Sequence, residues 1–345
     1  MQASKRPDID QWRKLFDLAT KFRKTKPWDL FSDSDFFAIR RPSNGEIVFP
    51  LIMGNGGQFF GLSIYLGETG LLQYSMAQAN FDTFDPIFMS MYSNILLSFM
   101  DRKFLSRDDL KLPGSMGMTF KGKNAWPQFR KMSCMHLDSQ ITGEEADLLI
   151  EIIPLIIDIV SLAREQPQLM SVFDQSPLPL FDKTGPESWV TTETKNMPNV
   201  MDALKPGNMV RDGDIKRFKY LDRKNAVWQL GWKGAPGGIG EDPDDLSSFA
   251  VVHLVDKKIP KILQFAFLTP SKREDLWPDL WNELMKMLNK EKFYPSELEV
   301  SDPWLLEFLK PLEEHLDIRI VMREAMPEMD DAFDFVFDAM EKGLF

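Results

Sequence analysis

The chain has 345 residues, of which 43% are hydrophobic, 12% aromatic and 27% charged. This balance excludes an intrinsically disordered protein, and the length exceeds what one hydrophobic core usually supports, so we expect two domains. The formal net charge of −11 argues against nucleic-acid binding through phosphate neutralisation, because that mode needs clustered lysine and arginine.

The cysteine content and the apolar segments indicate the compartment. Cys134 is the single cysteine, so no internal disulfide forms, and residues 1–8 lack the apolar stretch of a secretory signal. The most apolar segment, 148–163, contains two carboxylates and a proline and is shorter than the roughly 20 apolar residues of a membrane span. We therefore expect a cytoplasmic protein without a membrane anchor.

The first half predicts an α+β domain with an antiparallel sheet. A helix at 8–24 carries one apolar stripe at three- and four-residue spacing. Alternating apolar segments joined by hairpin-type turns then predict strands at 35–41, 46–53 and 58–66. A helix at 84–101, which would carry Met89, Met91 and Met100, and a strand at 129–137 follow. A buried helix then begins at a capping box formed by Thr142 and Glu145.

The region between the halves is rich in proline. Six prolines fall between residues 166 and 207 with little periodicity, which is typical of a linker. We expect an N-terminal domain over 1–175, a proline-rich linker over 176–207 and a C-terminal domain over 208–345.

The second half predicts a mixed α/β sheet. Three apolar segments bounded by turn residues predict consecutive strands, and the remaining segments alternate between helix and strand. The expected strands lie at 226–233, 248–257, 261–269, 297–300 and 318–322, with helices after the third, fourth and fifth. A single helix between buried neighbouring strands implies a right-handed parallel crossover. The element order is therefore βββαβαβα, which resembles ribonuclease-H-like domains.

The resemblance to ribonuclease-H-like enzymes implies a site for two divalent metal ions held by carboxylates from the first strand, the first helix, the fourth strand and the last helix. Here Asp302 follows the fourth strand, Glu283 lies in the first helix, and either Asp330 or Asp331 lies at the start of the last helix, with Asp331 preferred. The first strand offers no carboxylate at 227–230. A divergent nuclease or phosphoryl-transfer enzyme using Mg²⁺ or Mn²⁺ is thus one hypothesis, with Asp302 as the leading metal ligand.

Asp302 also has a structural interpretation, which we favour. Aspartate followed by proline is typical of a helix N-cap and first helical position, where the carboxylate accepts from an unpaired backbone N–H. Glu283 and Asp331 are equally consistent with solvated helix faces. His253 falls within a strand and is expected to be a packing residue.

Two glycine-rich segments invite comparison with phosphate-binding loops. The segments are 54–57 and 234–245, and each precedes a strand, whereas a phosphate loop requires a following helix. We therefore expect a hairpin turn for the first and an ordinary long connection for the second.

The first half resembles a bacterial domain family of unknown function. The resemblance rests on Lys26-Pro27-Trp28 and on the segments 53–62 and 65–71. In that family the domain is often joined to a second uncharacterised domain, which the stretch 297–335 resembles. No catalytic residues are implied.

Three functions remain open from the sequence. The preferred hypothesis is a non-catalytic binding or interaction module without a cofactor, with a protein partner or a second copy of the chain as its target. The alternative is the metal-dependent enzyme described above. The third is a small-molecule sensor whose ligand lies at the ends of the parallel strands.

Overall fold

The computed structural model describes residues 6–79, 85–173, 177–185, 188–193, 196–207, 209, 211–218, 220–235, 246–259 and 261–343. It separates into two compact units. The first comprises Met1–Gln78, Tyr92–Ser133 and Leu137–Pro198, and the second comprises Ala79–Met91, Cys134–His136 and Asn199–Phe345. The predicted connection at 234–245 falls largely outside the described residues.

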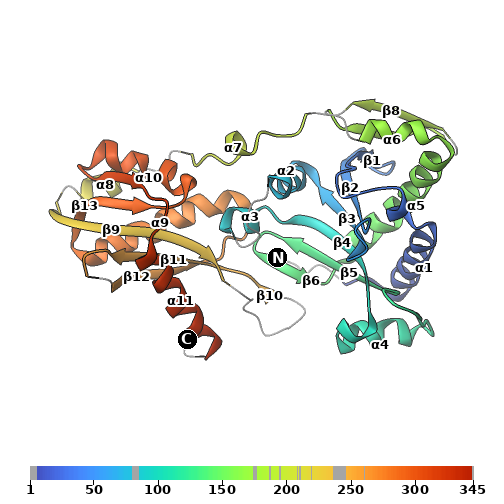
Figure 1. Ribbon diagram of the computed structural model, residues 1–345, viewed down its shortest axis with the longest axis horizontal. Coiled ribbons are helices and arrows are strands. Elements are labelled where there is room, and N and C mark those ends of the chain that lie inside the picture. Colours follow the sequence, from blue (N-terminus) through green and yellow to red (C-terminus); the bar gives the residue numbers. More distant parts are fainter. Residues whose placement is uncertain are drawn as a thin grey trace. The chain divides into compact units, whose positions relative to one another are not determined.

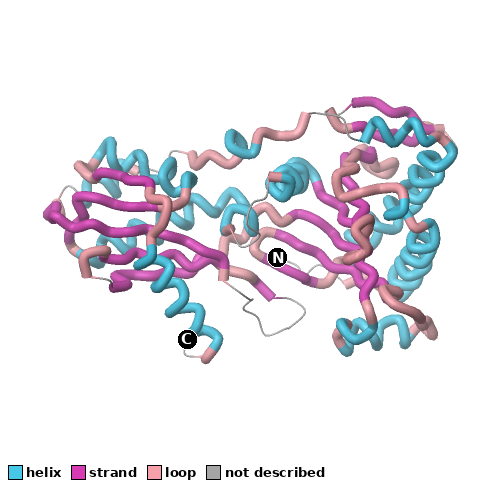
Figure 2. Tube along the Cα trace, in the orientation of Figure 1, coloured by secondary structure: helices cyan, strands magenta, loops and turns pink. Residues whose placement is uncertain are grey.

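The first unit is a helix-covered sheet (Figures 1 and 2). Its helices are α1 (Ile9–Thr25), α2 (Gly67–Gln78), α4 (Arg107–Ser115), α5 (Gly143–Glu165) and α6 (Met170–Phe173). Its strands are β1 (Ala38–Arg40), β2 (Ile47–Met53), β3 (Phe60–Leu66), β4 (Ser93–Met100), β5 (Trp126–Ser133), β6 (His136–Ser139), β7 (Pro179–Lys183) and β8 (Trp189–Glu193). Short 3₁₀ turns lie at Pro27–Asp29, Arg102–Phe104 and Pro167–Leu169.

Strand order in this sheet is β6-β5-β4-β3-β2-β1-β7-β8. The pairs β1–β2, β2–β3, β3–β4, β4–β5 and β7–β8 are antiparallel, and β1 runs parallel to β7. The expected α+β class with an antiparallel N-terminal sheet is therefore confirmed. Strands β7 and β8 lie inside the segment 176–207, so part of that proline-rich segment is sheet.

Both faces of the sheet are buried. Helices α1 and α5 lie side by side on one face (Figure 1), where Leu15 and Phe16 of α1 pack with Ile152 of α5 and with Ile52 and Leu62 of the sheet. The capping box predicted at the start of α5 is present, since the Thr142 side chain accepts from the backbone of Glu145. On the opposite face α2 contributes residues to a second apolar cluster that includes Phe36, Tyr65 and Tyr74.

The prediction of one helix over 84–101 is wrong. A short helix, α3 (Pro86–Ser90), is followed by β4, which begins at Ser93. Strand β4 is central in the sheet and buried on both faces, so its continuous apolar run has no alternation and imitates a buried helix. Met89 lies in α3 and Met100 ends β4, so the two do not share a helix face.

The second unit is built on a five-stranded mixed sheet. Its strands are β9 (Asp222–Gly234), β11 (Ala250–Asp256), β12 (Lys261–Leu268), β13 (Phe293–Val300) and β14 (Arg319–Met322), and the two-residue strand β10 (Leu246–Ser247) lies outside this sheet. Besides α3, its helices are α7 (Val200–Ala203), α8 (Asp212–Phe218), α9 (Leu276–Glu291), α10 (Pro303–His315) and α11 (Pro327–Glu341), with a 3₁₀ turn at Arg273–Asp275. The sheet elements follow one another as βββαβαβα, which confirms the predicted order.

Strand order in this sheet is β12-β11-β9-β13-β14. Strand β11 is antiparallel to both β12 and β9, and β13 runs parallel to both β9 and β14. Gly231 of β9 meets Met329 of α11, whereas the next residue, Trp232, stacks on Trp277 of α9. Because adjacent strand residues point to opposite faces, α9 and α11 cover opposite faces of the sheet.

Candidate functional site

Asp302 caps helix α10. Its Oδ1 accepts from the backbone N–H of Trp304 at 2.6 Å and of Leu305 at 3.3 Å. Its Oδ2 accepts from the indole Nε1 of Trp232 at 2.6 Å. Burial raises the pKa of Asp302, although these three hydrogen bonds favour the ionised form. Both carboxylate oxygens are therefore engaged by groups of the fold itself.

The other two predicted carboxylates do not join Asp302 in a cluster. Glu283 lies on α9 and pairs with Lys286 one turn later, with Oε1 2.6 Å from Nζ. Asp331 lies on α11 and is exposed. Within the described ranges, no set of three or more His, Cys, Asp or Glu side chains is arranged to hold a metal ion. The donors present therefore do not fit the two-metal site that the element order implies.

A buried polar network that the sequence did not predict occupies the middle of the sheet. Gln229 of β9 and Glu299 of β13 are aligned in the parallel register, and each is 1% exposed. Gln229 Nε2 donates to Glu299 Oε2 at 3.1 Å and to Glu328 Oε2, on α11, at 3.1 Å. The first strand thus places an amide next to the buried carboxylate of the fourth.

Two cations hold Glu299 in its ionised form. Lys257 Nζ lies 2.9 Å from both carboxylate oxygens, and Arg323 Nε lies 2.6 Å from Oε1. Burial by itself raises the pKa of Glu299, but hydrogen bonds from Lys257, Gln229 and Arg323 outweigh it and lower the pKa. Both oxygens of Glu299 are therefore held by charged or polar partners of the fold.

A small cavity lies at the end of these strands. It has a volume of about 250 Å³, and Asp302 and Asp330 are among its lining residues, together with Trp232, Lys233 and Ser301. This is the end of the sheet at which open α/β folds bind ligands. Asp85 also lines the cavity, so three acidic residues stand in its lining beside the apolar Leu305, Met329 and Phe333.

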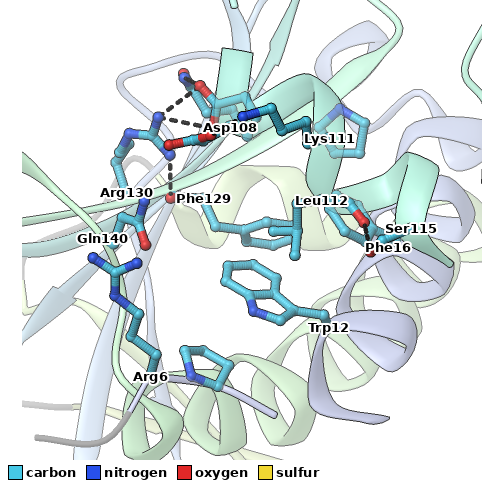
Figure 3. Close-up of a pocket in the computed structure, with 14 residues that line it drawn as sticks. Arg6, Trp12, Phe16, Asp108, Lys111, Leu112, Ser115, Phe129, Arg130 and Gln140 are labelled. Atoms are coloured by element: carbon cyan, nitrogen blue, oxygen red, sulfur yellow. Dashed lines mark hydrogen bonds and ion pairs between the residues drawn. The ribbon is translucent and has the colours of Figure 1, made fainter. Parts of the chain in front are cut away.

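A larger recess, of about 330 Å³, lies in the N-terminal unit between α1, α4 and β5 (Figure 3). Trp12, Phe129 and Leu112 lie together on one side of it, and Arg6, Gln140 and Arg130 lie along the other. The Trp12 ring is 6.0 Å from the Phe129 ring, measured between centroids. The recess thus combines an aromatic wall with a polar edge, as small-molecule sites usually do.

The polar edge is fixed by a buried ion pair. Arg130, 6% exposed, donates through Nη2 to both oxygens of Asp109 at 2.8 and 2.7 Å. Asp109 also accepts from Gln128 Nε2 and from the hydroxyl of Ser106, which caps α4. Burial alone raises the pKa of Asp109, but these partners, led by Arg130, lower it overall. The pair therefore stays charged and holds α4 against β5.

The sequence did not single out this recess. Trp12 and Phe16 belong to the apolar stripe predicted for the first helix, so the sequence predicts that they are core residues. Arg130 is one charged residue within an apolar strand, and Asp109 is one of several carboxylates in a polar segment. The single available signal was that a charge at a strand position needs a partner when it is buried.

Two family models match successive parts of the chain. Residues 12–179 match the model of a family described as Domain of unknown function (DUF7309), and residues 214–337 match that of a second, Domain of unknown function (DUF6930). No curated protein matches the chain. Within the described part of the chain, no helix combines the length and apolarity needed to cross a membrane. The chain is thus similar, over both halves, to domains to which no function is assigned.

Proposed function

We propose that this protein is a non-catalytic binding protein whose N-terminal domain holds a small ligand in the recess between α1, α4 and β5. The observation that carries the proposal is the preformed recess of Figure 3, with its aromatic wall and its edge fixed by Arg130 and Asp109. A rigid, partly apolar concavity of this size suits a compact ligand with a planar apolar body and an acidic group.

The charges at the recess favour an acidic ligand group. Arg130 pairs with Asp109 and Lys111 pairs with Asp108, so with Arg6 the lining has three positive and two negative charges and a net charge of +1. The planar body would lie against Trp12 and Phe129, where contact with an aromatic face adds to apolar burial. Binding to a protein partner or to a second copy of the chain stays a prediction.

The C-terminal domain supports the non-catalytic part of the proposal. The position at which a metal-dependent enzyme needs a first-strand carboxylate holds Gln229. Glu299 is neutralised by Lys257 and Arg323, and Asp302 caps a helix. Since a metal pair requires several free carboxylate oxygens, these residues serve the fold better than they serve phosphoryl transfer.

The recess is tested with 8-anilinonaphthalene-1-sulfonate, an anionic planar probe whose fluorescence rises in apolar surroundings. We expect saturable one-to-one binding that is lost in Ser115→Trp, because Ser115 is an exposed residue of the lining where an indole would fill the space. Thr119→Trp is the matched control, since Thr119 is exposed and lies outside the lining. Equal binding by wild type and Ser115→Trp would refute the recess as the binding site.

The metal-dependent alternative rests on the cavity that Asp302 and Asp330 share. It is tested by thermal unfolding with and without millimolar Mn²⁺, because an ion that binds the folded state alone raises the unfolding midpoint. Asp302→Asn is the informative variant, since asparagine preserves the helix cap while removing the charge. A rise in midpoint that disappears in this variant, together with cleavage of a nucleic-acid substrate, would overturn the non-catalytic proposal. An unchanged midpoint in both proteins supports it.

A further inference from the structure

We propose a second binding site in the N-terminal unit, for a small phosphorylated molecule that carries a planar ring. It is a cavity of about 400 Å³ at the C-terminal end of α1, distinct from the recess of Figure 3. Its lining consists of three cations, two aromatic rings and two small turn residues: Arg23, Lys26, Lys123, Trp28, Phe60, Gly57 and Asn124. In a protein of net charge −11, none of the described residues that line this cavity is a carboxylate.

The three cations of this cavity are not neutralised by carboxylates of the described residues. Lys26 and Lys123 form no ion pair within the residues that the structure describes. Arg23 donates only to neutral acceptors, with Nε 3.0 Å from the carbonyl oxygen of Asn124 and Nη2 3.3 Å from that of Lys123. These bonds fix the loop that carries Lys123 beside the end of α1. Three unneutralised cations therefore converge from two segments about 100 residues apart.

The aromatic residues form a wall beside the cations. The rings of Trp28 and Phe60 lie 4.8 Å apart between centroids, and both side chains are half-buried. A residue with a side chain at position 54 would prevent this, because a Cβ there would lie 2.7 Å from Phe60 Cδ1 and 3.0 Å from Trp28 Cβ. The partly exposed indole offers a face on which a planar ring can stack.

Two residues of the cavity have an uncommon left-handed backbone, which costs more for lysine than for asparagine. Lys26 and Asn124 both have left-handed backbones, with φ of 45° and 47°. Glycine is the usual residue for a left-handed helix end, because it adopts that conformation without steric cost. Lysine at position 26 has a higher conformational energy than glycine would have there, but it adds a positive charge at the cavity. Strain of this kind concentrates at binding sites.

The helix dipole explains only part of the positive charge. Basic residues in a last helical turn stabilise the negative end of the dipole, which accounts for Arg23 and Lys24 of α1. It does not account for Lys123, which arrives from the loop before β5. A phosphate group matches the convergent cations, and a planar ring attached to it matches Trp28.

Isothermal titration calorimetry with adenosine 5′-monophosphate and with inorganic phosphate tests the site. We expect the nucleotide to bind more tightly than phosphate, because the nucleotide alone supplies a ring. Lys26→Gly and Lys123→Ala should each weaken nucleotide binding about tenfold, which corresponds to one charge-assisted hydrogen bond. Lys24→Ala and Lys121→Ala are matched controls, since both lysines are exposed, lie near the tested ones and do not line the cavity.

Lys26→Gly separates binding from folding. Glycine relieves the left-handed backbone, so the variant should unfold at the same temperature as wild type or higher while it binds the nucleotide less tightly. Ser115→Trp should leave nucleotide binding unchanged, which distinguishes this site from the proposed recess. Absence of binding at millimolar nucleotide overturns the proposal, as does equal weakening by the control variants, which would indicate general charge attraction.

Discussion

His253 should make the C-terminal domain sensitive to mild acid. The residue lies in β11 with its side chain fully buried, and its ring stacks on Phe333 of α11 with centroids 4.6 Å apart. Neither ring nitrogen has a hydrogen-bond partner among the residues that the structure describes. Burial lowers the pKa of His253 from 6.5 to about 4, because the apolar surroundings penalise the charged imidazolium.

The direction of the effect follows from which state binds the proton. In the unfolded chain the imidazole is protonated below its ordinary pKa of 6.5, whereas in the folded protein it stays neutral down to about 4. The unfolded state therefore binds more protons across this window, and stability is lost as the pH falls through it. The full loss is about 3 kcal/mol, of which about 2 kcal/mol falls between pH 7 and pH 5.

His253→Phe removes this dependence and keeps a ring against Phe333. We expect the variant to be more stable than wild type at pH 7 too, because two unsatisfied nitrogens cost about 1–3 kcal/mol. The assay is urea unfolding at pH 7 and pH 5, followed by pulsed hydrogen exchange of peptides from β11, which reports on this domain alone. His253→Leu is the second variant, because leucine removes the imidazole without adding the larger volume of a phenylalanine ring. A loss of stability between the two pH values that is as large in both variants as in wild type would refute the reasoning.

Three further predictions concern single residues of the second unit. Asp302→Ala should lower stability by about 2–4 kcal/mol in urea unfolding, because it removes the α10 cap and leaves the Trp232 indole N–H unpaired. Asp302→Asn should cost about 1–3 kcal/mol, because its one amide oxygen keeps the cap while its NH₂ group cannot accept from the indole N–H. Gly231→Ala should cost about 1–3 kcal/mol, since the added Cβ would lie 2.8 Å from Met329 Cγ; an unchanged urea midpoint would contradict the close packing of α11. Cys134 should react slowly with iodoacetamide at pH 8 and rapidly in urea, because burial raises the pKa of its thiol to about 12; equal rates would contradict that environment.

Strong periodicity and capping chemistry made much of the fold predictable. The first helix, the Thr142 capping box and the order βββαβαβα all follow from patterns that act within a few residues. Asp302 as an N-cap also follows from its position before a proline. Where an element is buried on both faces, as β4 is, the pattern that distinguishes strand from helix disappears.

The side-chain clusters could not be predicted, because they join distant segments. Glu299 meets Lys257 and Gln229 only when β13 pairs with β9, and Arg130 meets Asp109 only when α4 packs on β5. None of these residues stands in a motif, and each looks like an ordinary polar residue along the chain. Pairing register, which sets which side chains meet, is a property of the assembled sheet.

The assignment of α3 to the second unit has a consequence for synthesis of the protein. Residues 86–90 leave the ribosome long before β9, the strand that they contact in that unit. At ordinary elongation rates the interval is on the order of ten seconds. During that time Phe88 and Met89, which are buried in the finished fold, have no partner strand to cover them. During translation this apolar segment therefore waits, without the strand that it packs against, until β9 has been synthesised.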